Sequence, residues 1–297
     1  MSYPKLIIQI DCDGDYVISQ HYNVPRYSTD VFYSSLDIYI NKFCKNNLKS
    51  TLFLVGNDVR EKGYRECIAN AIRFGHEIAN HSYSHSSNFS QLHLSDFRNE
   101  VIQTNNLIEM TYGVKCKGFR APNFDFNNIF VKVLEEEGFL YDCSSISTPY
   151  KFILRMLKGA KGSGYMRQLS NIDKEGHISK NGKNIVIDDF VKISVSTFPY
   201  LRFPCHFSYL LAMPPELSEK AMNALIKWHI RHNVPLVYIF HLADIVDNAY
   251  LYGTELKYYK NVEKRLDLLD KFINQVRDSF ESCTTLQYCN WLKNNEK

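Results

Sequence analysis

The sequence predicts a single α/β domain in which parallel strands alternate with helices and close into a distorted (β/α) barrel. Short apolar runs of strand length alternate with longer segments of helical periodicity. Polar side chains gather where the apolar runs end, as in barrels whose active site lies at one end of the strands. The 297 residues show no internal repeat and no linker, and an α/β barrel commonly uses 200–250 residues as one domain.

The first half of the chain repeats the strand–helix unit. The strands are apolar on both faces, which is typical of parallel strands covered by helices. Ser28 and Thr29 can cap the first helix, and glycines end the later helices. The expected strands are 5–10, 51–55, 77–79, 115–119 and 139–141. The expected helices are 28–46, 64–74, 95–112 and 127–137.

This order breaks after Asp142 and returns at Pro214. Residues 146–213 contain a stretch rich in Gly, Lys and Ser with short apolar runs, and we expect an inserted region of loops and small strands there. A helix at 216–233, a strand at 236–240, a helix at 255–280 and a last strand at 283–288 are expected to complete the single domain, 1–297.

Composition excludes several classes of protein. Hydrophobic residues make up 45% and charged residues 23%, which excludes disorder, and a net charge of +3 gives no reason to expect a nucleic-acid partner. The eight cysteines form no CxxC pair, so we expect reduced thiols. No run is long enough to span a bilayer, and the first residues do not resemble a secretory signal, so the prediction is a cytoplasmic protein.

The residues after the strands suit metal chemistry. His81 and His85 are spaced i and i+4, which would place them on one face of a helical turn ~6 Å apart. Two imidazoles and one carboxylate make a three-ligand site that leaves a position open for water. Asp11 and Asp13 are close enough to repel unless a cation lies between them or one of them is protonated. Ser82 stands where an HExxH motif needs Glu, so a zincin is excluded.

Several motifs together resemble one known family. The most specific is GHEIANHSYSH (75–85), and IDCDGD (10–15), STLFLVG (50–56), GFRAP (118–122), GFLYDCSS (138–145) and FHLAD (240–244) accompany it. In these motifs the sequence resembles the polysaccharide deacetylases with NodB homology, carbohydrate esterase family four, in the branch with a DxD first motif. The similarity covers about residues 5–145 and resumes near 235–250.

The resemblance implies a barrel of seven or eight strands and a metal-dependent hydrolase that removes an N-acetyl or similar acyl group from an amino sugar or a polysaccharide precursor. It implies that Asp11 is the catalytic base, that Arg120 positions this base and that His241 is the general acid. The implied metal ligands are Asp13, His81 and His85. Zn²⁺ is the first choice for such ligands, and Co²⁺, Ni²⁺ or Fe²⁺ would also fit.

Some assignments stay open. The third motif continues here as Asn123-Phe124 rather than aromatic-Gly, and Asp142, Asp244 and Asp247 all compete as the partner that tunes His241. The weaker candidates for substrate contacts are Pro122, Asn123, Asp142 and His206.

The substrate and the partners also stay open. Alternatives to an N-acylated sugar are a lipid-linked sugar, a ureide or imide C–N bond, and a catalytically silent sugar-binding protein. Lys151, Arg155 and Lys158 recur at helical spacing among apolar residues in 148–162. This pattern suits either a cap over the barrel or peripheral contact with an anionic membrane surface. The acyl group, the native metal and the oligomeric state are not predicted.

Overall fold

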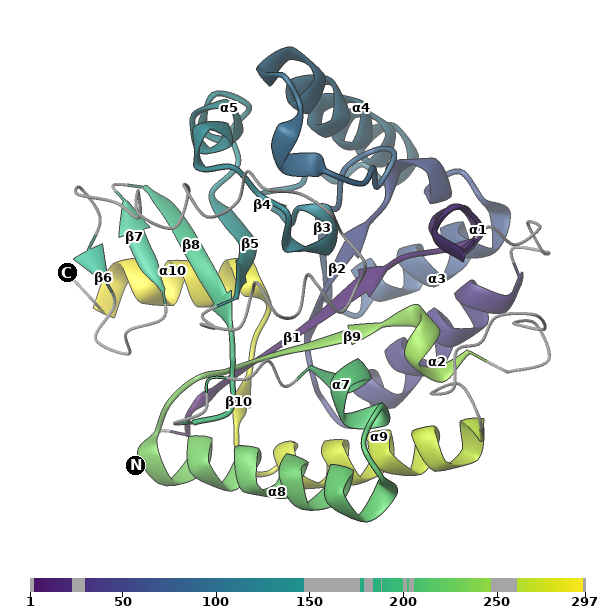
Figure 1. Ribbon diagram of the computed structural model, residues 1–297, viewed down its shortest axis with the longest axis vertical. Coiled ribbons are helices and arrows are strands. Elements are labelled where there is room, and N and C mark those ends of the chain that lie inside the picture. Colours follow the sequence, from purple (N-terminus) through teal and green to yellow (C-terminus); the bar gives the residue numbers. More distant parts are fainter. Residues whose placement is uncertain are drawn as a thin grey trace.

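The computed structural model describes residues 3–22, 30–146, 177–178, 184–187, 189–199, 202, 206–246 and 261–295. Seven parallel strands lie in the order β9-β1-β2-β3-β4-β5-β8 and nearly close into a barrel (Figure 1). They span β1 (Lys5–Cys12), β2 (Ser50–Leu54), β3 (Glu77–Asn80), β4 (Gly118–Phe119), β5 (Tyr141–Ile146), β8 (Phe190–Val195) and β9 (Leu236–His241). The predicted barrel is thereby confirmed.

The gap between β8 and β9 is bridged rather than fully paired. Just past the end of β8, the Ser196 amide donates to the Val237 carbonyl at 3.1 Å, and the Val237 amide donates to Ser196 Oγ at 3.0 Å. On its other side β8 continues into the antiparallel strands β7 (Ile185–Ile187) and β6 (His177–Ile178). These small strands lie in the predicted inserted region, 146–213.

Helices cover the outside of the barrel (Figure 1). The α-helices are α1 (Asp15–Tyr22), α2 (Asp30–Lys45), α3 (Lys62–Arg73), α4 (Leu94–Tyr112), α5 (Val131–Glu136), α7 (Phe207–Leu211), α8 (Pro215–His232), α9 (Val262–Val276) and α10 (Thr285–Asn295). Short 3₁₀ turns follow several strands: η1 (Gly56–Asp58), η2 (Phe89–Gln91), η3 (Pro122–Phe124), η4 (Asn128–Phe130) and η7 (Leu242–Ile245). Among the described residues no helix is long and apolar enough to cross a membrane.

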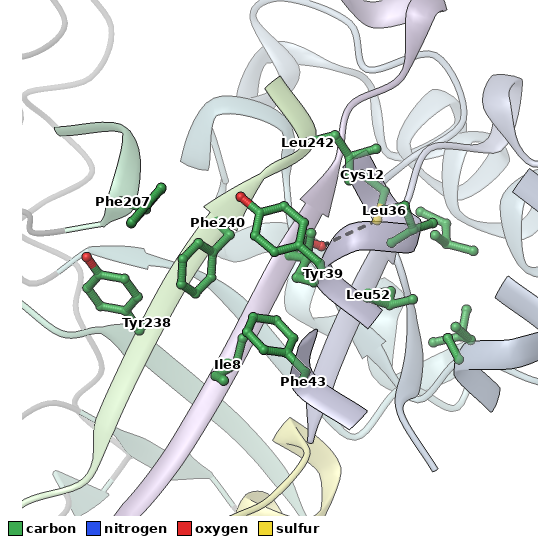
Figure 2. Packing of buried hydrophobic residues seen from close by; sticks show 14 of the residues in the cluster. Ile8, Cys12, Leu36, Tyr39, Phe43, Leu52, Phe207, Tyr238, Phe240 and Leu242 are labelled. Atoms are coloured by element: carbon green, nitrogen blue, oxygen red, sulfur yellow. Dashed lines mark hydrogen bonds between the residues drawn. The ribbon is translucent and has the colours of Figure 1, made fainter. Parts of the chain in front are cut away.

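The two faces of β1 show why the strands are almost continuously apolar. Leu6, Ile8 and Ile10 join the large cluster beneath the outer helices, whereas Ile7 joins a separate cluster inside the barrel. Figure 2 shows the outer cluster at β1 and β9, where the rings of Tyr39 and Phe43 from α2 lie against Phe240 at centroid distances of 5.3 and 5.8 Å. Alternation places Gln9 and Asp11 on the same inner face as Ile7.

Several expectations about the helices and strands are wrong. Residues 283–288 do not form a strand: β10 is only Glu281–Ser282, and α10 begins at Thr285. The start of this helix is set by distant partners, because the amides of Thr285 and Leu286 donate to Thr51 Oγ1 and Glu77 Oε2. The second error is α1, which had no counterpart in the prediction.

The basic segment 148–162, with Lys151, Arg155 and Lys158, lies outside the described residues. Its two interpretations, a cap over the barrel and a membrane contact, therefore stay predictions.

The fifth strand is also shifted. It was expected at 139–141, with Asp142 beyond its end, but β5 runs from Tyr141 to Ile146. Asp142 therefore lies inside the strand and is buried. The pairing of β5 with both β4 and β8 extends the strand past the point at which its local apolar run ends.

Candidate active site

Asp13, His81 and His85 meet at the carboxyl ends of β1 and β3. The Nε2 atoms of His81 and His85 each lie 3.5 Å from Asp13 Oδ1. The potential ligand atoms of the three residues are all within 4.8 Å of one another. The Arg120 carbonyl lies 2.8 Å from His81 Nδ1, and because a carbonyl only accepts, this nitrogen carries the proton. The lone pair of His81 is therefore on Nε2, the atom that faces Asp13.

The loop between the two histidines is not helical, so the expected helical turn is wrong. Ser82 and His85 adopt left-handed backbone angles, with φ of 65° and 50°. The loop is fastened from α4: Glu100 Oε2 accepts from the amides of Tyr83 and Ser84, both at 2.8 Å. The two imidazoles meet because this turn folds back, with ring centroids 5.1 Å apart.

The turn after β1 is held in a similar way by Asp58 of η1. Its carboxylate accepts from the amides of Gly14 at 3.2 Å and Tyr16 at 3.3 Å. A Cβ added at Gly14 would lie 2.7 Å from Asp58 Cγ, so the close approach requires glycine. Asp13, two residues after Asp11, is thus presented on the inner side of the barrel mouth.

Asp11 is paired with Arg120 inside the barrel. Arg120 Nη1 donates to Asp11 Oδ1, Nη2 donates to Gln9 Oε1, and Nε donates to the Cys143 carbonyl at 3.3 Å. Arg120 is 0% exposed and Asp11 is 3% exposed. Burial alone would raise the pKa of Asp11, but the charges of Arg120, His81 and His241 outweigh it and lower this pKa to about 2. Asp11 is therefore a carboxylate at neutral pH.

His241, at the end of β9, faces Asp11 from the other side of the mouth. Its Nε2 lies 3.7 Å from Asp11 Oδ2. Its backbone amide donates to Asp244 Oδ2 at 2.8 Å, and Ser208 Oγ lies 2.9 Å from its Nδ1. Burial lowers the pKa of His241, but the adjacent Asp244 side chain and the charges of Asp11 and Asp13 raise it to about 9. Of the two open aspartates that the structure describes, Asp142 and Asp244, the one beside His241 is Asp244.

Asp142 has a different place. Its Oδ1 accepts from the amide and the hydroxyl of Ser144, and Ser144 Oγ in turn accepts from the Ala121 amide at 2.7 Å. Burial raises the pKa of Asp142. Through Ser144, Asp142 therefore holds the turn that follows β4. Asp247, the third aspartate considered, lies outside the described residues.

The turn after β4 carries the other substrate candidates. Pro122 is buried, and Asn123 has φ of 54°, a left-handed angle that Asn tolerates better than most residues. Phe124 is also left-handed, and its ring packs against the barrel residues Ile146, Val195 and Ile239. His206 is buried at the start of α7, where its ring centroid lies 5.6 Å from that of His241.

Six of the sequence-predicted residues are gathered at one end of the barrel: Asp11, Asp13, His81, His85, Arg120 and His241. The structure adds four residues that no motif indicated. Gln9, Asp58, Glu100 and Ser208 each hold a candidate residue or its turn by a side-chain hydrogen bond. Two of them lie beside a motif: Gln9 directly precedes IDCDGD, and Asp58 lies two residues after STLFLVG.

The donor set fits one divalent cation. One carboxylate oxygen and two imidazole nitrogens converge, and His81 has its Nδ1 proton fixed by a carbonyl, as is typical of metal-binding histidines. Zn²⁺, Co²⁺, Ni²⁺ and Fe²⁺ all accept such ligands. A neighbouring carboxylate and a neighbouring imidazole, Asp11 and His241, remain available for proton transfer.

Comparison with solved structures identifies the fold. The fold is matched by a Mycobacterium smegmatis protein assigned to the polysaccharide deacetylases, with a TM-score of 0.64 and 17% identity over 99% of this chain and 92% of that one. A CE4 family pseudoenzyme from Bacillus anthracis has a TM-score of 0.52 at 12% identity, over 97% of this chain and 66% of that one. These likenesses establish the fold.

In the sequence comparison, one segment of the chain matches a known family. Residues 37–141 match the family model described as polysaccharide deacetylase. The peptidoglycan-N-acetylglucosamine deacetylase of Bacillus cereus is 27% identical over 109 residues, which are 37% of this chain and 38% of that protein. This part of the chain is therefore similar to the polysaccharide deacetylases, as its motifs led us to expect.

The extent of the match matters for the site. Matches to curated relatives span only 14 to 38% of those proteins' lengths. The family-model segment contains His81, His85 and Arg120, whereas Asp11, Asp13 and His241 lie outside it. The barrel, not the matched segment, brings the second group to the first.

Proposed function

We propose that this protein is a metal-dependent hydrolase that removes an N-acetyl or similar acyl group from an amino sugar or polysaccharide precursor. One observation carries the proposal: a three-ligand cluster, an ionised carboxylate paired with arginine and an imidazole beside an aspartate share one barrel mouth. The family supports the acyl-sugar class of substrate.

Asp13, His81 and His85 would hold the cation. When bound, a divalent cation polarises the amide carbonyl and lowers the pKa of bound water toward neutrality. Asp11 accepts the proton of the attacking water, because Arg120 keeps this carboxylate ionised and points it toward the mouth. His241 donates a proton to the departing amine from Nε2, the nitrogen that faces Asp11. Each proton transfer is worth ~10²–10⁴-fold in rate.

The alternative functions differ in their support. A silent sugar-binding protein would need a missing ligand, base or acid, and the fold does occur in a pseudoenzyme. Here all six residues of the proposed machinery are present and grouped, which favours an active hydrolase. A lipid-linked sugar or a ureide or imide C–N bond would use the same six residues, so only the substrate screen separates these cases.

The test combines metal content with product release. Purified protein is analysed for metal by mass spectrometry, then screened for acetate release from N-acetyl sugars and from their nucleotide-linked and lipid-linked forms, and for formate release from the N-formyl forms. Asp13→Ala, His81→Ala and His85→Ala should each lose the metal and the activity, whereas His93→Ala, at an exposed position, should lose neither. The proposal would be refuted if purified wild type contained no metal and its hydrolytic activity did not change with chelators or with added Zn²⁺ or Co²⁺.

A further inference from the structure

Ser208 joins His241, the proposed acid, to the neighbouring Asp244, and no motif indicates this serine. It lies on the short helix α7, inside the region expected from the sequence to be an insertion. Its hydroxyl donates to Asp244 Oδ1 at 2.6 Å and lies 2.9 Å from His241 Nδ1. The direct distance from His241 Nδ1 to Asp244 Oδ2 is 3.7 Å, which is too long for a hydrogen bond. The serine therefore stands between the acid and its aspartate.

The single hydroxyl hydrogen of Ser208 determines which group donates and which accepts in these two contacts. A serine hydroxyl has one hydrogen, and a carboxylate can only accept, so that hydrogen points to Asp244. In the protonated imidazolium both ring nitrogens carry hydrogens, and the Nδ1 hydrogen then faces a lone pair of Ser208 Oγ. The hydrogen on Nε2, on the opposite side of the ring, faces Asp11 and the barrel mouth.

We propose that Ser208 is a positioning residue that relays the negative charge of Asp244 to His241 and holds the imidazolium with Nε2 toward the leaving amine. This inference rests on the proposed function, because it concerns the donor of the proton in that reaction. Ser208 itself gains and loses no proton overall: it accepts from Nδ1 and donates to Asp244 before and after Nε2 has delivered its proton.

The other charges around His241 are accounted for. Asp11 and Asp13 face it from β1, and Arg120 is bound to Asp11. The ring of His206 lies beside it on α7. Arg265 of α9 donates to the Asp244 carbonyl at 2.9 Å rather than to the carboxylate. Tyr39 of α2 donates to the His241 carbonyl at 3.2 Å. Where its Nδ1 carries no hydrogen, the His241 side chain accepts from the backbone amide of Asp244, which completes a capping box. In the imidazolium form Nδ1 carries a hydrogen, and Ser208 Oγ, which is bound to the Asp244 carboxylate, is its acceptor.

The first experiment compares Ser208→Ala with Ser208→Thr, which keeps the hydroxyl. Ser282→Ala, which removes a hydroxyl bonded to Lys49 at the opposite end of the barrel, serves as the control. Ser208→Ala should lower kcat ~10-fold, with KM and metal content unchanged, because the ring loses its orientation but no ligand is lost. The alkaline limb of the kcat profile should move to lower pH, since the acid loses an acceptor for its charged form. Ser208→Thr should restore both.

The second experiment needs no catalysis. The titration of His241 is followed by NMR in metal-free protein, with its signal assigned by its absence in His241→Gln. The pKa of His241 should fall by about one unit in Ser208→Ala and stay in place in Ser282→Ala. An unchanged titration in Ser208→Ala would overturn the relay, because Asp244 would then act directly. A wild type without hydrolytic activity would count against the proposed function and leave this titration result to decide the relay.

Discussion

Removing the buried Arg120 guanidinium should lower the free energy of unfolding more than any other change at the site. The size of this loss can be worked out from the contacts of Arg120. Arg120→Met keeps a long apolar side chain in the space but leaves three acceptors without their donor: the Asp11 carboxylate, Gln9 Oε1 and the Cys143 carbonyl. Breaking a buried ion pair from one side typically costs 3–5 kcal/mol, because the remaining charge stays in the interior. We expect a loss of ~4 kcal/mol in the free energy of unfolding.

The assay is urea unfolding followed by far-UV circular dichroism, with chelator present so that metal binding does not contribute to stability. Arg98→Met is the control, because Arg98 pairs with Glu136 and Glu137 at the surface, where solvent screens the ion pair, and it should change stability far less than Arg120→Met. The double variant Asp11→Asn with Arg120→Met removes both buried charges. It should be more stable than Arg120→Met alone by ~2 kcal/mol.

The loss in Arg120→Met should also depend on pH in a defined direction. Without the arginine, burial raises the pKa of Asp11 above its ordinary value of 3.8. A carboxyl whose pKa is higher in the folded state than in the unfolded state loses stability as the pH rises. The deficit should therefore be larger at about pH 7.5 than at about pH 4.5. The reasoning would be refuted if Arg120→Met lost less than ~1 kcal/mol of stability, or if its loss were the same at both pH values and in the double variant with Asp11→Asn.

Three further predictions follow from other parts of the structure. Asp11→Asn should keep the metal but lower kcat by ~10²-fold or more, whereas Asp13→Asn should lose the metal; the opposite pattern in metal analysis and kinetics would mean that the two roles are reversed. Glu100→Gln should weaken Zn²⁺ binding by ~10-fold in chelator competition, because it loosens the loop of Tyr83 and Ser84, and equal affinity to the exposed control Glu109→Gln would contradict this. Burial lowers the pKa of His76 to about 4 from 6.5, so stability should fall as the pH drops between these values, and His76→Gln should show a smaller fall in urea midpoints.

The sequence determined the fold class and most of the chemical groups. Apolar runs at strand length, separated by helical segments and ended by glycines, are local patterns, and each can be recognised without knowing its neighbours. The same holds for the polar residues at the strand ends, since parallel strands bring their carboxyl ends to one side. The order of residues along the chain is therefore enough to expect Asp11, Asp13, His81, Arg120 and His241 near one another.

Tertiary structure decided how those groups are held. Gln9 reaches Arg120 over 111 residues and Ser208 reaches Asp244 over 36, and no local pattern marks either partner. The change from an expected strand to α10 has the same cause, because its first amides are bound by Thr51 and Glu77, more than 200 residues away. Local propensity sets which conformations a segment can adopt. Which buried donor meets which acceptor depends on the closed barrel, since only closure makes an unpaired polar group in its interior costly.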